Sequence, residues 1–296
     1  MKKRLMVLFL LLTPMSILKA SPQSPDYIII GNDTLPIYQL ILEDYLQSIK
    51  QPTDSTSLFG FSFYDDFRYF STGCVRGYQA VYSLENDSLF LKHIIPCHSL
   101  EEFNADVIDN SNKQMQRLFQ EKVKNDKVFI DWYSSEFTIP KGKLIWWNYI
   151  FTVIYDKEEL YTIRKGILVD KHIISNYQKV KGGISRDKKE MSKAIFDEIK
   201  KLDWKKLDDE FLCSDKYCIE IDYRGKVINV EKDYYGELDE YDIYCQKAIN
   251  NQLKNLQFDI ILCHGRPFND SFCIEVYYDN NTNQLKKWSY DDDDDD

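Results

Sequence analysis

The chain has 296 residues, of which 44% are apolar, 29% are charged and 15% are aromatic. This composition is typical of a folded soluble protein of about two domains, and it excludes a collagen, a coiled coil, a multi-span membrane protein and a disordered chain. There are 38 Lys and Arg against 48 Asp and Glu, and the lysines of 200–206 alternate with acids around a predicted helix, so we expect no nucleic-acid partner.

Residues 1–20 have the features of a secretory signal peptide: a basic start, a short apolar run, and a small residue at Ala20. The alternative is an uncleaved membrane anchor, but the apolar run 5–18 is interrupted by Pro14 and is shorter than the roughly 20 residues that a span needs. We expect cleavage after Ala20, which leaves 34 basic against 48 acidic residues and a formal net charge of −14. The protein is then exported, to the periplasm or the cell exterior of a Gram-negative bacterium, and its signal peptide is its only membrane segment.

Residues 21–175 are predicted to form a mainly antiparallel β domain with one or two helices. After a strand at 27–30 and a helical stripe at 37–49, the period-two pattern of 77–94 turns at Glu85-Asn86-Asp87 and predicts a β-hairpin. Met115, Leu118 and Phe119 mark one amphipathic helix. The strands that follow are expected at 127–132, 136–140, 143–155, 159–164 and 166–174.

Residues 176–190 contain two Gly and many charges, which favours a linker. A second domain is predicted over 191–290: one helix, then the order β, β, α, β, with the strands at 217–222, 227–233 and 271–279 and the second helix at 239–256. Residues 291–296 are six Asp, a solvated tail whose like charges repel. The fold class expected is therefore α+β.

Within 216–279 the spacing resembles the C-terminal domain of TonB-type energy transducers. The matching positions are Gly225-Lys226-Val227, Leu238-Asp239, Phe258, Gly265-Arg266-Pro267-Phe268, and the alternating strand Phe272 to Tyr278. The resemblance implies a small ββαβ module that binds a protein or peptide of the cell envelope by adding a strand to an exposed sheet edge. The chain lacks a retained inner-membrane span and a Pro-rich linker, which a working energy transducer needs.

The resemblance to the TonB C-terminal domain implies that the last strand, 271–279, is the exposed edge of the sheet. Alternation places Ile274, Val276 and Tyr278 on the face toward the helix, and Cys273, Glu275 and Tyr277 on the other face. We therefore expect partner binding at Cys273, Glu275 and Tyr277.

The first half resembles an uncharacterised family of exported bacterial proteins. The resemblance rests on Gly31 to Tyr38, Phe70 to Leu91 and Val128 to Leu144, and it implies no known activity.

Two sets of residues in this half could bind a ligand. Asp131, Trp132 and Glu136 could form a glycosidase or carbohydrate-binding face, with Trp132 stacking on a sugar; the competing interpretation is a strand end whose aromatics complete the core. Arg76 needs a carboxylate or carbonyl partner if it is half-buried, and it could hold either a loop or a ligand.

The remaining candidates are the cysteines, the histidines and three short glycosylation motifs. The seven Cys can form disulfides or be buried as small apolar residues, and an odd number leaves at least one unpaired. His93, Cys97 and His98 lack the two close ligand pairs of a structural zinc site, and nothing positions Cys74 beside a base, so we expect no metal, no cofactor and no catalytic residue. Acceptor sites of a bacterial O-glycosylation system are matched at Thr34, Ser55 and Ser88.

These observations favour an exported, non-enzymatic envelope protein whose C-terminal module recognises a protein or peptide by strand addition. The alternative is a secreted hydrolase or glycan-binding protein that uses the N-terminal domain around Asp131, Trp132 and Glu136.

Overall fold

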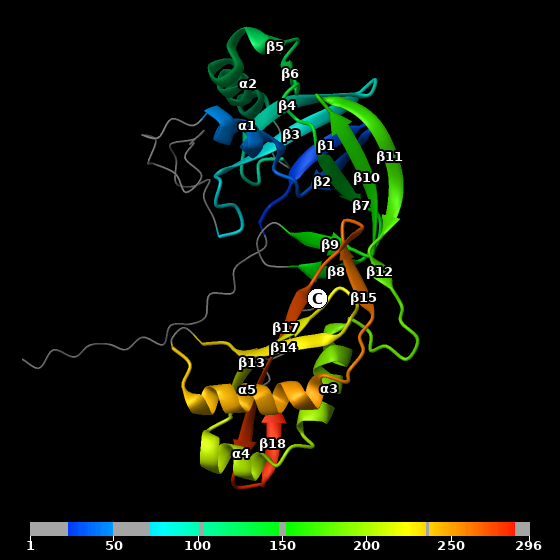
Figure 1. Ribbon diagram of the computed structural model, residues 1–296. Helices are drawn as coiled ribbons and strands as arrows, with labels where there is room; N and C mark the ends of the chain where they lie inside the picture. Colours follow the sequence, from blue (N-terminus) through cyan, green and yellow to red (C-terminus); the bar gives the residue numbers. More distant parts are fainter. Residues whose placement is uncertain (1–22, 50–71, 101–103, 148–151, 235–236, 288–296) are drawn as a thin grey trace, which may run out of the picture.

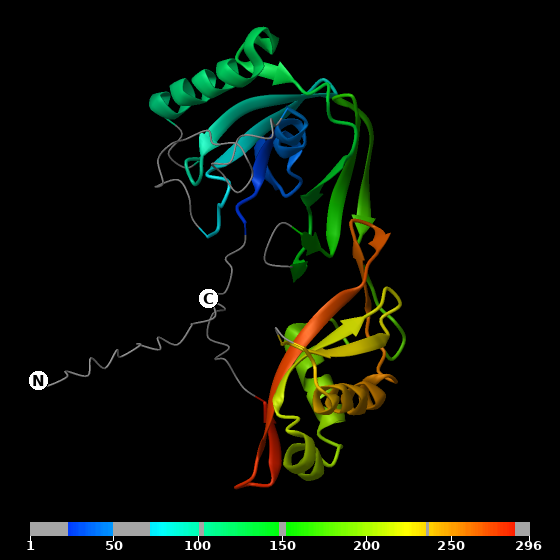
Figure 2. The ribbon, with the colours of Figure 1, turned by 60° about the vertical axis from the view of Figure 1, so that its left-hand side comes forward.

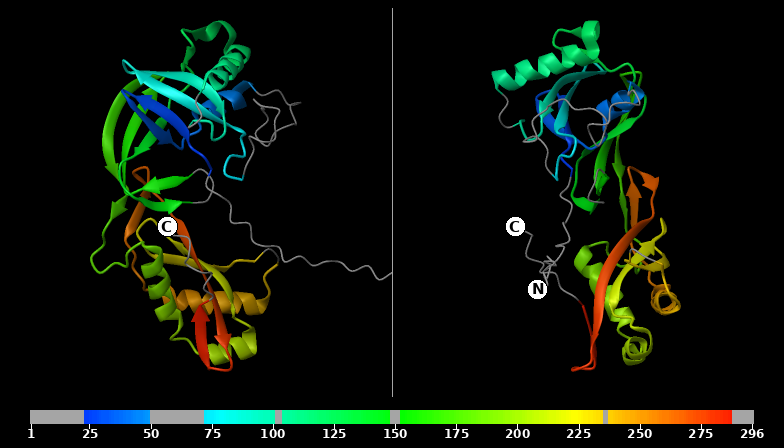
Figure 3. Two further views of the ribbon diagram at one scale, coloured as in Figure 1. Left: turned by 180° about the vertical axis from the view of Figure 1, so that it is seen from behind. Right: turned by 90° about the vertical axis from the view of Figure 1, so that its left-hand side faces the viewer.

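The computed structural model describes residues 23–49, 72–100, 104–147, 152–234 and 237–287. The expected signal peptide, Ser55 and the acidic tail lie outside these ranges. The described chain is α+β, with mostly antiparallel strands. It forms an N-terminal and a C-terminal unit, one above the other in Figure 1, and Figure 3 shows the same two units from behind and from the side.

The N-terminal unit is a strongly curved sheet in the order β2-β1-β3-β4-β11-β10-β7, with β6 paired to β4 and β5 to β6. Only β1 and β3 pair in parallel. The elements are β1 (Asp26–Ile30), β2 (Asp33–Ile37), α1 (Ile41–Ile49), β3 (Tyr78–Glu85), β4 (Ser88–Pro96), α2 (Ala105–Phe119), the 3-10 turn η2 (Gln120–Lys122), β5 (Val123–Lys124), β6 (Lys127–Phe129), β7 (Glu136–Pro140), β10 (Lys157–Arg164) and β11 (Ile167–Ser175).

Local sequence explains the elements that were expected. The side chain of Asn104 accepts hydrogen bonds from the first-turn amides of α2, and Met115 and Phe119 on one stripe of that helix are buried. Asn86 and Asp87 adopt positive φ between β3 and β4, as a two-residue hairpin turn requires. The core therefore lies between the concave face of the sheet and the helices α1 and α2.

Residues 143–155 do not form the single buried strand that was expected. The chain reverses between β8 (Leu144–Trp147) and β9 (Val153–Tyr155), which pair as a separate antiparallel ladder. Leu144 is exposed whereas Ile154 is buried. An apolar run of this length cannot show where it folds back on itself.

The C-terminal unit contains a four-stranded antiparallel sheet in the order β14-β13-β17-β18, packed against three helices. Figure 2 shows β17 as its longest strand, running down from the other unit to β18. Asp side chains cap the start of each helix: Asp187, Asp203 and Asp239. The elements are β12 (Tyr177–Gln178), α3 (Lys188–Ile199), α4 (Trp204–Phe211), β13 (Asp215–Ile221), β14 (Val227–Lys232), α5 (Glu240–Leu253), β15 (Ile260–Cys263), β16 (Arg266–Pro267), β17 (Asp270–Asp279) and β18 (Gln284–Lys287).

Residues 176–190, the segment expected to be a linker, make specific polar contacts with the rest of the chain at several positions. Asn176 is fully buried and Arg186 is nearly so, paired with Asp270 at the start of β17. The hydroxyl of Tyr177 donates to Asp259 at 2.7 Å. Asn176 and Arg186 can be buried because each forms hydrogen bonds or an ion pair with residues far away in the chain.

Three disulfides link six of the seven cysteines: Cys74–Cys97, Cys213–Cys245 and Cys218–Cys273. Cys263 is free and half-buried. The sequence left the pairing open, and the structure places one bridge in the N-terminal unit and two in the C-terminal unit.

Candidate functional site

Among the described residues, the first half of β17 has a strand partner on one side and none on the other. On the paired side, Asp270–Val276 bonds to β13. The pair Cys218↔Cys273 carries the disulfide, with the Cα atoms 3.9 Å apart, as in a non-hydrogen-bonded pair of an antiparallel ladder. The amide of Tyr278, an even-numbered residue, donates toward Ser214 next to β13. Even-numbered residues of β17 therefore bond to β13, and the N–H and C=O groups of Ser271, Cys273 and Glu275 face outward.

The outward groups of Ser271, Cys273 and Glu275 meet no other strand in the described part of the chain. Farther along, β18 pairs with Val276–Asp279, so Tyr277 is opposite Lys286. The expectation that Tyr277 lies at an open edge is therefore wrong. The short, polar strand β18 was not foreseen, and it restricts the open edge to the first half of β17.

The side chains along this edge agree with the predicted alternation. Ile274 and Val276 are buried in the core beneath α5, whereas Cys273 is exposed and Glu275 is half-buried on the opposite face. The Cys218–Cys273 disulfide lies on that opposite face and joins β17 covalently to β13. The edge is thus held rigidly in the sheet.

Arg76 is a structural residue of the N-terminal core. It is 3% exposed, and its guanidinium lies 3.0 Å from the carboxylate of the fully buried Asp26 and donates to the carbonyl of Ser24 at 3.1 Å. Nearby, Tyr78 donates to Glu43; burial raises the pKa of the Glu43 carboxyl, and this hydrogen bond offsets part of the rise. Of the two roles considered for Arg76, the geometry favours holding the chain and not a ligand.

The structure separates Asp131, Trp132 and Glu136. The indole of Trp132 is packed against Tyr45 and Phe119, with ring centroids 4.6 and 5.5 Å away, and its partial burial completes the core. Asp131 is exposed and lines neither of the two cavities described below. Glu136 alone lines both cavities.

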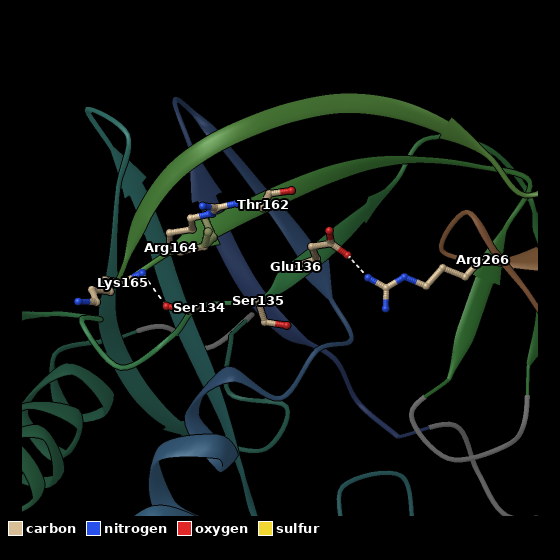
Figure 4. A pocket seen from close by; sticks show the side chains of 8 residues that line it. Ser134, Ser135, Glu136, Thr162, Arg164, Lys165 and Arg266 are labelled. Carbon is tan, nitrogen blue, oxygen red and sulfur yellow. Dashed lines mark hydrogen bonds and ion pairs between the residues drawn. The ribbon is translucent and has the colours of Figure 1, made fainter.

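Two adjoining cavities lie along β7 and β10, where the hairpin of β15 and β16 approaches the N-terminal sheet. Their volumes are about 640 and 510 Å³, and both are lined by Ser135, Glu136 and Arg266. Figure 4 shows Arg266 reaching from the hairpin to Glu136, 2.6 Å away, while Arg164 and Lys165 lie toward the other end of the larger cavity.

The hairpin of β15 and β16 is fastened to the N-terminal unit by polar contacts that sequence reasoning missed. His264 Nδ1 lies 2.7 Å from the carboxylate of Glu158, which is 1% exposed, and 3.3 Å from the hydroxyl of Thr138. Gly265 donates to the side chain of Asn176 at 2.7 Å. Burial lowers the pKa of His264, but its hydrogen bonds to Cys263 and Glu158 and their charges outweigh this and raise it to about 10. No local pattern could reveal the pair, because 106 residues separate its members.

The glycosylation candidates and the metal-ligand candidates lie apart from these features. Thr34 is exposed but belongs to β2 and not to a turn, and Ser88 begins β4 directly after the hairpin turn. Cys97 is bonded to Cys74. The described residues contain no cluster of three metal-ligating side chains. None of the helices in the described part of the chain has the length and apolar character of a membrane span.

Comparison with known proteins adds no relative: no protein-family model matches the chain, and neither a curated protein nor a solved structure is significantly similar to it. We therefore infer function from the geometry of the molecule.

Proposed function

We propose that this protein is an exported, non-enzymatic protein of the cell envelope that binds a protein or peptide as an added strand along Ser271–Glu275 of β17. The observation that carries the proposal is the set of outward backbone groups at Ser271, Cys273 and Glu275, on a strand that is paired on its other side. An unpaired strand edge is a template for another chain.

The proposal includes a TonB C-terminal-like module in the second unit. The succession of β13, β14, α5 and β17 and the antiparallel pairing of β13 with both β14 and β17 support it. The hairpin of β15 and β16 and the added strand β18 are departures from a plain ββαβ order. They confine a bound strand to the first half of β17, end to end with β18.

The affinity available from this edge is modest. Each backbone hydrogen bond contributes a net gain of about 0.5–1.5 kcal/mol, and the three outward residues offer one donor and one acceptor each. The incoming peptide loses conformational freedom at roughly 1–2 kcal/mol per residue. Side-chain contacts on the faces of β17 must therefore supply most of the specificity, as in other cases of strand addition.

Hydrogen exchange tests the geometry of the edge without a partner. In the free mature chain, we expect the amides of Cys273 and Glu275 to exchange rapidly and that of Ile274, which faces β13, to be protected. A protected Glu275 amide in the isolated protein would show that the edge is already occupied.

A pair of substitutions at one position tests binding. Glu275→Pro removes an outward donor without breaking the ladder to β13, whereas Glu275→Thr keeps the donor and a strand-forming residue. We expect a quantitative cross-linked pull-down from the native envelope to recover the same partner with wild type and Glu275→Thr, and to lose it with Glu275→Pro.

Thermal melts of both variants show whether the loss is specific. An unchanged partner yield with a folded Glu275→Pro protein would remove the basis for strand addition. Unfolding of Glu275→Pro alone would show that position 275 is not part of an open edge, because an edge position tolerates Pro.

A further inference from the structure

The larger cavity along β7 and β10 carries unbalanced positive charge in an acidic protein. The chain has 38 basic against 48 acidic residues, yet Arg164, Lys165 and Arg266 all line this cavity, with Glu136 as its one acidic lining residue within the described chain. Arg266 is paired with Glu136. Arg164 and Lys165 are exposed, and neither has a carboxylate partner among the described residues.

The cations are arranged along the cavity and not at one point. Figure 4 shows Arg164 and Lys165 toward one end, Arg266 at the other, and Ser135 and Glu136 between them. The second cavity continues past Arg266 to His264, which is protonated at neutral pH because its pKa is raised by Cys263 and Glu158 to about 10. A ligand with negative groups at intervals along its length fits this arrangement better than a single small anion.

The lining between the cations is rich in hydroxyl groups. Ser134, Ser135 and Thr162 line the larger cavity, and Ile163 is the one aliphatic side chain among its described lining residues. Because hydroxyls and a carboxylate can donate to and accept from a polyol, this surface suits a hydrated, hydroxyl-rich molecule and not the apolar ligands of most pockets.

The backbone around these side chains is fixed. Lys165 adopts positive φ in the turn between β10 and β11, and its amide donates to the hydroxyl of Ser134 at 2.8 Å. Gly166, also at positive φ, donates to the carbonyl of Tyr133 and accepts from the amide of Leu89. The cations at this end are therefore presented from a turn that two neighbouring segments hold in place, which reduces the cost of binding.

We propose that the cavities between β7, β10 and the hairpin of β15 and β16 bind an acidic saccharide, whose carboxylate or phosphate groups pair with Arg164, Lys165 and Arg266 and whose hydroxyls bond to Ser135 and Glu136. This site is separate from the edge of β17 and goes beyond strand addition. It also differs from a sugar-stacking face at Trp132, because that ring is packed in the core.

Isothermal titration of the full mature chain tests the site. The probes are tri-galacturonic acid, its methyl ester as a neutral match, and a hexose phosphate that carries phosphate groups at both ends of the sugar. We expect the acid to bind and the ester to bind at least tenfold more weakly, with affinity falling as salt rises, since charge-assisted bonds at exposed positions are screened. Binding of the hexose phosphate in place of the uronate would assign phosphate as the anionic group.

Matched variants locate the binding. Arg164→Gln with Lys165→Gln removes two exposed cations from the cavity, and Lys205→Gln with Lys206→Gln removes two exposed cations from α4. We expect the first pair to weaken binding roughly tenfold or more and the second by less than twofold.

Three results would overturn the proposal: no binding of either anionic probe, equal binding of the methyl ester, or equal losses from both variant pairs. The test is independent of Glu275, so its failure leaves strand addition untouched and the converse also holds.

Discussion

His264 should remain protonated well above neutral pH, and its ion pair with Glu158 should stabilise the contact between the two units. Its imidazole lies 2.7 Å from the carboxylate of Glu158, and the side chains are 26% and 1% exposed. Burial disfavours the charged ring, but hydrogen bonds and charges from Cys263 and Glu158 raise its pKa from 6.5 to about 10. His93 provides the opposite case, since burial and the charge of Lys92 lower its pKa to about 4.

The sign of the pH effect follows from the raised pKa. Between pH 6.5 and pH 10 the folded state holds a proton that the unfolded state releases, so the free energy of unfolding falls as pH rises. Its steepest slope is about 1.4 kcal/mol per pH unit. From pH 7 to pH 9 the stabilisation by the pair can therefore fall by at most about 2.7 kcal/mol, and solvent screening of the partly exposed ring reduces this loss to about 2 kcal/mol. The contribution is complete below pH 6.5 and is lost above pH 10.

Two measurements check this effect. NMR titration of the histidine ring protons should show His264 still charged at pH 8 and His93 still neutral at pH 6. Urea unfolding of wild type and His264→Gln, with the disulfides intact, should show a difference in stability that shrinks by about 2 kcal/mol from pH 7 to pH 9.

The substitution keeps a donor toward Glu158 but removes the charge, so groups that titrate elsewhere cancel in the comparison. A ring that titrates between pH 6 and pH 7, or a stability difference that is the same at both pH values, would refute the reasoning.

Two further predictions concern the N-terminal unit. Arg76→Met leaves the fully buried carboxylate of Asp26 without its cation. We expect urea unfolding to show that the free energy of unfolding falls by about 3–5 kcal/mol, and that adding Asp26→Asn restores part of it. A fall below about 1 kcal/mol would contradict the buried ion pair. Gly166→Ala brings a Cβ within 2.4 Å of a backbone carbonyl at φ +78°, whereas the Cβ of Gly31→Ala, at φ +63°, meets open space. The second substitution should therefore cost only the roughly 1–2 kcal/mol of backbone strain, and the first should lower the free energy of unfolding clearly more. Equal losses of stability would show that the packing around the turn is looser than described.

The local sequence pattern was sufficient to predict an element where each residue's environment is set by its neighbours in sequence. The hairpin of β3 and β4 follows from alternation around Asn86 and Asp87, and α2 from the stripe that contains Met115 and Phe119. The same holds for the alternation of Ile274 and Val276 in β17. These features carry their own periodicity, which is independent of the rest of the fold.

The sequence could not show which strand lies beside another. β18 (Gln284–Lys287) has no apolar alternation, yet it covers the end of β17 and shortens the open edge. The docking of His264 likewise depends on Glu158 of the other unit, and Asn176 is bonded to Gly265, which lies 89 residues away in the chain. The sequence also left open whether Trp132, beside Asp131 and near Glu136, stacks on a ligand or fills the core, and only the positions of the surrounding rings decide between the two.

The open edge of β17 is rigid before any partner arrives. Its first residue, Asp270, is paired with the buried Arg186, and Cys273 is joined to Cys218 by a disulfide within the ladder to β13. A bound strand therefore meets backbone groups that lose little freedom on binding, and nearly all of the ordering cost falls on the incoming peptide. It follows that stiffening the peptide in an extended conformation should tighten binding more than any substitution that stiffens β17 itself.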